Sequence, residues 1–160
     1  MDELDRIQQA WATEIPALDT SSMALIGRLQ IVHKRLSQGM SANFRQFGLT
    51  DAGFDVLATL RRSGAPYQLT PNQLLAQTLI TSGSLTSRLQ SLEKQGFITR
   101  SCASNDKRSI EVTLTANGKT VIEQALVAHV ATQQQLLNGL SHTEQQQLVL
   151  LLRAFIQATA

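Results

Sequence analysis

The sequence predicts a mainly α-helical protein in which two helices joined by a tight turn are followed by a β-hairpin. Leu, Ile, Val and Ala supply most of the 42% of apolar residues, whereas aromatic residues make up only 4%. This composition suits packed helices better than stacked sheets. Apolar residues recur at helical spacing through most of the chain, and the alternation typical of strands is confined to about residues 97–114. A chain of 160 residues is expected to form a single domain, 1–160.

The first part of the chain is predicted to form three helices, over residues 3–14, 21–46 and 51–62. The first ends before Pro16, because the residue that precedes a proline disfavours the helical conformation. The second is long and amphipathic, and Gly48 follows it as a break. Thr50 is a good N-cap for the third, since its hydroxyl can accept a hydrogen bond from a free backbone N–H of the first turn.

The next two predicted helices are separated by a short turn. Thr70 and Pro71 begin a helix that runs to about residue 78, because Thr is a good cap and Pro is favoured at the first helical position. A longer helix follows over residues 82–95, and Gly96 ends it. Its apolar residues form one stripe that we expect to be buried: Leu85, Leu89 and Leu92.

A hairpin and two more helices complete the expected fold. Residues 97–99 and 110–114 read as strands, with a polar loop between them. Thr115 is expected to cap a helix that runs to about residue 137. Ser141 and Glu144 form a capping-box pattern before a final, strongly apolar helix.

Positive charge is concentrated beside the hairpin, which favours a polyanionic partner. Residues 81–110 carry a net charge of +3, whereas the rest of the chain carries −1. We expect the exposed face of helix 82–95 to present small polar donors and Arg88, which can reach phosphates and base edges. The hairpin tip can follow the DNA backbone or enter the minor groove. The candidate residues for contact with double-stranded DNA are Ser82, Ser84, Thr86, Ser87, Arg88, Lys107 and Arg108.

Two interpretations without sequence-specific DNA binding remain open for this surface. The helix and the hairpin tip could be ordinary solvated elements. Alternatively, the protein is an interaction module that uses the same fold for protein contacts without sequence-specific DNA binding. The basic residues at the hairpin tip, Lys107 and Arg108, argue against both.

The sequence offers no pattern for catalysis, for a metal or for a cofactor. It has no Gly-rich phosphate loop and no nucleophile elbow, and we expect surface or interface positions for its histidines, which are His33, His129 and His142. Cys102 is the only thiol, so an intrachain disulfide is impossible and a reducing compartment is expected; a redox role for it stays open. No apolar stretch approaches the roughly 20 residues that span a bilayer. We therefore expect a cytoplasmic, non-enzymatic protein with no membrane partner.

Two segments resemble the MarR family of winged helix-turn-helix regulators: SLTSRLQSLEKQGFITR (84–100) and SNDKRSIEVTLTANGK (104–119). The resemblance covers most of the chain. It implies a winged helix-turn-helix over about residues 50–114 and dimerisation helices within about 1–46 and 116–160. It also implies a homodimeric regulator, a repressor, that binds a pseudo-palindromic operator, because a two-fold pair of subunits matches two half-sites.

Two further segments are similar to the urate-responsive branch of this family: WATEIPALDTSSMALIGRL (11–29) and FDVLATLRRSGAPYQLTP (54–71). That similarity implies an anionic effector such as urate or xanthine, bound by Trp11, Asp55, Arg88 and Arg100. Guanidinium groups can bind the anion, the indole can cover it, and Asp55 can accept from ring N–H groups or hold an Arg in the empty site. The run Ser-Arg-Leu-Gln-Ser at 87–91 departs from the Asn-Arg-x-Asp-Arg run of that branch.

Each of these residues also has a simpler interpretation. Trp11 can be a core residue, and Asp55 can be a structural partner of an arginine. Arg88 can contact a phosphate in place of the effector, or in a different state of the protein. Arg100 can contact a phosphate or be an ordinary surface residue.

Overall fold

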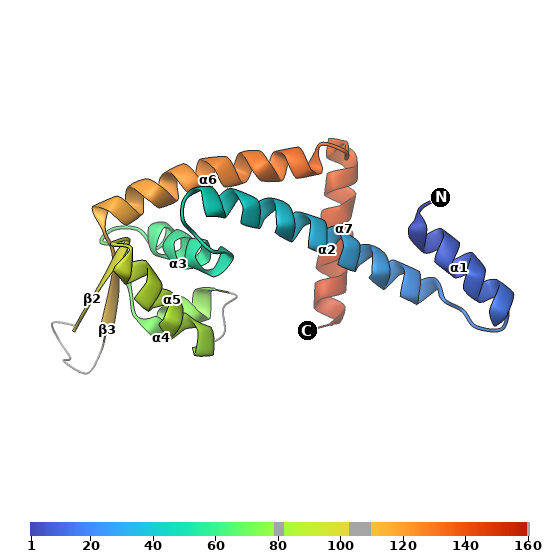
Figure 1. Cartoon of the computed structure of the whole chain (residues 1–160), viewed down its shortest axis with the longest axis horizontal. Coiled ribbons are helices and arrows are strands. Elements are labelled where there is room, and N and C mark those ends of the chain that lie inside the picture. The colour runs from blue at the N-terminus through green and yellow to red at the C-terminus, as the bar shows by residue number, and fades with distance from the viewer. Residues whose placement is uncertain (79–81, 103–109, 160) are drawn as a thin grey trace. The chain divides into compact units, whose positions relative to one another are not determined.

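The computed structural model describes residues 1–78, 82–102 and 110–159, except for the side chains of 82–84. These residues form two compact units, Met1–Gly39 and Met40–Ala160, which we describe separately. Figure 1 shows the elements in chain order. They are α1 (Glu3–Glu14), α2 (Ser21–Gln46), α3 (Asp51–Arg62), β1 (Gln68–Leu69), α4 (Pro71–Gln77), α5 (Ser82–Lys94), β2 (Ile98–Cys102), β3 (Ile110–Leu114), α6 (Ala116–Leu137) and α7 (His142–Ala158).

In the first unit, an ion pair and a close approach join α1 to α2. Arg28 of α2 binds the Asp2 carboxylate with both Nε, at 2.8 Å, and Nη2, at 2.9 Å, and it also contacts Asp5. This arginine, together with the Asp5 backbone N–H, holds the pKa of Asp2 below its usual value. Gly27 permits the approach, since a Cβ at this position would lie 2.7 Å from Cδ1 of Leu4. Every residue of α1 remains at least partly exposed.

The second unit is built around α3, which lies at the centre of the core. The side chains of Val56, Leu57 and Leu60 are fully buried. Around them pack apolar residues from the neighbouring elements: Leu69, Leu74, Leu85, Leu89, Leu92, Ile98, Val112, Leu114 and Ile122. One face of α5 and one face of the hairpin are thereby fixed against the same core.

The described strands form an antiparallel sheet in the order β1-β3-β2. Arg100 pairs with Val112 across the hairpin, and Thr99 pairs with Thr113. The hairpin was expected from the sequence, but β1 was not. With only two residues, β1 is too short to show an alternating pattern, and its pairing with β3 defines it.

The helix boundaries agree closely with those predicted from capping residues. The hydroxyls of Thr50, Thr70, Thr115 and Ser141 each accept the N–H of the residue three positions later, at 3.1, 3.3, 2.9 and 3.4 Å respectively. Gly96 has a φ of +73° just beyond α5, which is the left-handed conformation that commonly ends a helix. Hydrogen bonds between residues close in the chain therefore determine where most of these helices begin and end.

An aromatic cluster joins the end of α2 to α3 and α6. The rings of Phe44 and Phe54 stack with their centroids 4.2 Å apart, and the His129 ring lies 5.0 and 4.8 Å from them. Burial lowers the pKa of His129 below its usual value. His129 is partly buried and packs against the core of its own unit, a contact that the sequence did not indicate.

A close backbone contact fixes the start of α6 to the base of the hairpin. The Thr115 N–H donates to the Phe97 carbonyl at 3.0 Å, and the Thr115 hydroxyl donates to the Gly96 carbonyl at 2.7 Å. A Cβ placed on Gly118 would lie only 2.0 Å from the same Phe97 oxygen. Only glycine fits here without a movement of the backbone.

We predict that Gly118→Ala destabilises the protein by about 2 kcal/mol or more, because the added methyl group overlaps a backbone carbonyl. In an ordinary helix interior, Gly→Ala stabilises a protein by about 1 kcal/mol. The sign of the change in the free energy of unfolding therefore tests for the close contact. The measurement is the free energy of unfolding from urea titration. Gly139→Ala is the matched control, since a Cβ there meets no atom within 4 Å. A gain in stability for Gly118→Ala would contradict the close contact.

Candidate nucleic-acid interface

The helix-turn-helix pair consists of α4 and α5, and it is held by one buried face. Leu74 of α4 is fully buried. The predicted apolar stripe of α5 is buried as expected, with exposures of 3%, 4% and 2% for Leu85, Leu89 and Leu92. Residues on the opposite face of α5, among them Thr86 and Gln90, are exposed. β2 and β3 follow α5 along the chain (Figure 1).

The candidate DNA-contacting residues differ in where the structure places them. Thr86 and Ser87 are exposed on α5, whereas Arg88 is half-buried at the edge of the leucine stripe. Ser82 and Ser84 lie in the first turn of α5, with side chains outside the described part of the chain. The hairpin-tip residues, Lys107 and Arg108, also lie outside the described residues.

Arg100 is engaged in an ion pair with Glu93 of α5. Its Nε and Nη2 atoms lie 2.9 and 2.5 Å from the same carboxylate oxygen, Oε2. The hydrogen bond from this guanidinium is the main reason that the pKa of Glu93 falls below its usual value. The pair links the end of α5 to β2. An anion that binds Arg100 has to compete with this resident carboxylate.

Arg88 faces a depression of about 370 Å³ that the sequence alone did not reveal. Its lining residues are Ser41, Arg45, Leu49, Thr50, Asp51, Ala52 and Arg88. The Ser41 hydroxyl lies 2.8 Å from both carboxylate oxygens of Asp51. The Nε of Arg88 is shielded from solvent and has no hydrogen-bond partner in the described part of the molecule. Arg45 and Arg88 come from α2 and α5, so only tertiary structure brings them together.

The remaining candidate effector residues lie on α3 and α1. Asp55 is half-buried on α3, one turn beyond Asp51. Trp11 belongs to the Met1–Gly39 unit, and 38% of its surface is exposed. Within that unit it lines a small hollow of about 80 Å³, together with Leu4, Ile7, Gln8, Thr20, Met23 and Ala24.

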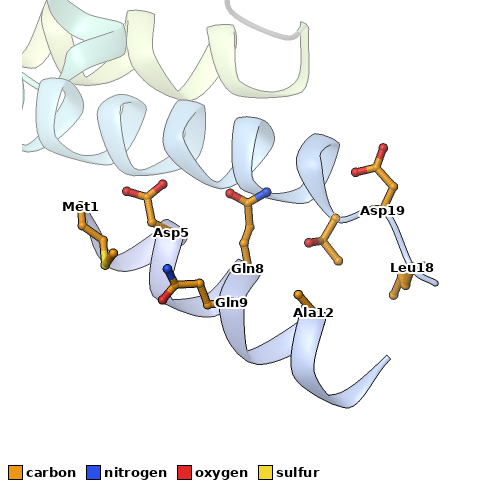
Figure 2. A pocket seen from close by; sticks show the side chains of 8 residues that line it. Met1, Asp5, Gln8, Gln9, Ala12, Leu18 and Asp19 are labelled. Carbon is orange, nitrogen blue, oxygen red and sulfur yellow. The ribbon is translucent and has the colours of Figure 1, made fainter. Parts of the chain in front are cut away.

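A more open hollow of about 550 Å³ lies in the same unit, where α1 meets the segment before α2 (Figure 2). Its labelled side chains include Asp5, Gln8 and Gln9 of α1 and Asp19 from the connecting segment. No lysine or arginine lines it, and two carboxylates do. This hollow is therefore a poor site for an anion.

The described part of the chain offers neither a group of side chains suited to a metal ion nor a helix suited to a membrane. Within ranges 1–78, 82–102 and 110–159, no group of three or more His, Cys, Asp and Glu side chains is placed to hold a metal ion. Over the same part of the chain, no helix combines the length and apolar character needed to cross a membrane.

Comparison with known proteins identifies the family. The model of the MarR family matches residues 47–109. The chain is 36% identical over 150 residues to the HTH-type transcriptional regulator PecS of Dickeya dadantii, covering 94% of this chain and 90% of that protein.

Solved structures agree with this sequence match. A mutant of MarR from Escherichia coli, crystallised with operator DNA, aligns with a TM-score of 0.71 and 26% identity over 91% of this chain and 96% of that one. A MarR-like protein from Bacillus cereus aligns with a TM-score of 0.79 over 89% and 100% of the two chains; at 19% identity it supports the fold alone. These relatives, together with the helix-turn-helix pair and the hairpin that follows it, place the chain in the MarR family. It is a DNA-binding winged-helix transcriptional regulator, and this family is not one of enzymes.

Proposed function

We propose that this protein is a homodimeric repressor that leaves a pseudo-palindromic operator when it binds a small anionic effector, urate or a related purine such as xanthine. The observation that carries the proposal is the position of Arg88. It lies on the recognition helix between the exposed face with Thr86 and Ser87 and a pocket on the inner side. A ligand that moves this arginine changes the helix that reads DNA, which couples the two binding events.

The proposed DNA contacts divide between α5 and the hairpin tip. Ser82, Ser84, Thr86, Ser87 and Arg88 contact phosphates and base edges from the helix. Lys107 and Arg108, assigned from the sequence, neutralise phosphates beside it. Small side chains on α5 support this assignment, since they allow the backbone to approach the duplex closely.

We predict that the protein shifts its own upstream DNA in a mobility assay, selectively and with strong dependence on salt. Arg108→Ala should weaken this binding by about tenfold and reduce the salt slope by about one, as expected for the loss of one phosphate contact. Arg35→Ala, an exposed arginine of α2, is the control and should bind as the wild type does. Absence of any selective shift would favour the interaction-module alternative.

The proposed dimer is built from helices in about residues 1–46 and 116–160. Every residue of α7 is at least partly exposed, although the helix is strongly apolar. The exposed large side chains of α7 are Leu148, Val149, Leu150, Leu151, Leu152, Phe155 and Ile156. A soluble monomer rarely presents such a continuous apolar surface, and a second copy can cover it, with about 25 cal/mol gained per Å² of apolar area removed from water.

We predict a solution mass of twice 17.5 kDa for the wild type, measured by sedimentation equilibrium. Leu151→Glu should shift the equilibrium strongly toward the monomer, because it buries a charge where 68% of a leucine is exposed in one subunit. Gln157→Glu is the matched control, because it lies one turn from Arg153 on the polar face of the same helix, and it should remain dimeric. If the Leu151→Glu protein is still a dimer, α7 does not form the interface.

The proposed effector residues are Trp11, Asp55, Arg88 and Arg100. Arg88 and Arg100 supply the positive charge for the anion. Glu93 holds Arg100 in the free protein, so it acts as an internal competitor for the ligand. When an effector anion replaces the Glu93 carboxylate at Arg100, the end of α5 becomes free to shift. This exchange supports a coupling between effector binding and DNA binding.

We predict that urate changes the fluorescence of Trp11, the single tryptophan, and releases DNA in the mobility assay. Calorimetry with urate and xanthine gives an independent affinity. Trp11→Phe should lose the optical signal and bind urate more weakly. If neither purine produces heat with the wild type, the purine part of the proposal is wrong, and DNA binding is unaffected by that result.

A further inference from the structure

The pocket at Arg88 holds a pair of cations that the quartet of effector residues does not explain. We infer that Arg45 and Arg88 together bind the anionic group of the effector, and that Asp51 accepts a hydrogen bond from an N–H or O–H donor on the same molecule. The inference rests on the proposed function, because it assigns the site at which the effector acts. It adds Arg45 and Asp51, which no sequence pattern had singled out.

One charged group of the pocket, the Arg88 guanidinium, has an N–H that is shielded from water and lacks a partner in the described part of the molecule. Among the ion pairs of the described residues, none joins Asp51 to Arg45 or to Arg88. A neutral hydroxyl, that of Ser41, binds both oxygens of Asp51 instead. Arg45 is exposed, and the Nε of Arg88 is shielded from water without a partner. A shielded N–H of a guanidinium without an acceptor is costly, so an anion that accepts from it gains more than at an open surface.

The shape and chemistry of the pocket select the class of ligand. A volume of about 370 Å³ is at the small end of ligand sites, and Leu49 and Ala52 provide apolar walls. The two guanidinium groups favour a planar anionic group that can accept paired hydrogen bonds. Asp51 repels a ligand that has only acceptors and favours one that also donates. The fitting class is a compact organic anion with a ring N–H or O–H donor.

The same geometry accounts for regulation. Arg88 follows Leu85 by three positions and immediately precedes Leu89, so its backbone is fixed by the buried stripe while its side chain can turn toward either side. An anion between Arg45 and Arg88 holds that side chain on the pocket side. The guanidinium, which already faces the pocket in the structure, is then prevented from turning to the DNA-facing side of α5, and affinity for the operator falls.

The test follows the arginine Nε–H signals of the full-length dimer by NMR during titration with three probe anions. The probes are urate, 4-hydroxybenzoate and benzoate. 4-Hydroxybenzoate has a carboxylate and an O–H donor, whereas benzoate has a carboxylate only. Spectra of Arg45→Gln and Arg88→Gln assign the two signals. We expect both signals to shift with urate and with 4-hydroxybenzoate. Benzoate should bind at least about tenfold more weakly than 4-hydroxybenzoate, because it leaves Asp51 without a donor.

Arg45→Gln should weaken urate binding, measured by calorimetry, by about tenfold or more, and the ratio of DNA affinities without and with urate should fall toward one. Arg35→Gln, on the same helix, is the matched control and should change neither value. If urate shifts neither signal while 4-hydroxybenzoate shifts both, the result supports the pocket, and the proposal of a purine effector is wrong.

Three outcomes would overturn the inference. In the first, none of the three anions shifts the signals of Arg45 and Arg88. In the second, urate releases DNA equally well from Arg45→Gln and from the wild type, which would leave the proposed function intact with a different site. In the third, Arg45→Gln weakens DNA binding without ligand and leaves anion binding unchanged, which would make Arg45 a DNA contact.

Discussion

The burial of the leucine stripe of α5 is the constraint on which the rest of the interface depends. Leu85, Leu89 and Leu92 pack into the same core as α3 and the hairpin, so they leave only one face of the helix free. Their burial determines that Thr86 and Ser87 are exposed and that Arg88 lies at the boundary between solvent and core. A helix held less firmly could not present its polar residues at a defined depth to a DNA groove.

Carboxylates lie beside the arginines that the proposed function assigns to the effector. Glu93 occupies Arg100, and Asp51 shares the pocket with Arg45 and Arg88. Glu93 forms an ion pair with Arg100, whereas Asp51 is bound by the Ser41 hydroxyl and, among the described residues, forms no ion pair with Arg45 or Arg88. In the proposed function, an anion at Arg100 exchanges with Glu93, so its binding free energy can be transmitted to α5, which bears Glu93.

Much of the fold could be predicted from local signals. The capping residues Thr50, Thr70, Thr115 and Ser141 marked helix starts that the structure confirms, because a side-chain oxygen bonds a backbone N–H only three residues away. The strand β1 could not be predicted, since its two residues are defined by pairing with β3. The packing of His129 against Phe44 and Phe54 was missed for a similar reason, as these residues are far apart in the chain.

The sequence by itself determined the order and bounds of the helices, the hairpin, the buried face of α5 and the family of the protein. These properties depend on spacing along the chain and on hydrogen bonds between near neighbours. Tertiary structure alone decided that Arg88 is half-buried, that Glu93 holds Arg100, and that Arg88 shares a pocket with Arg45. The physical reason is that the distance between charges on different elements is set by how those elements pack. Sequence spacing carries no information about that distance.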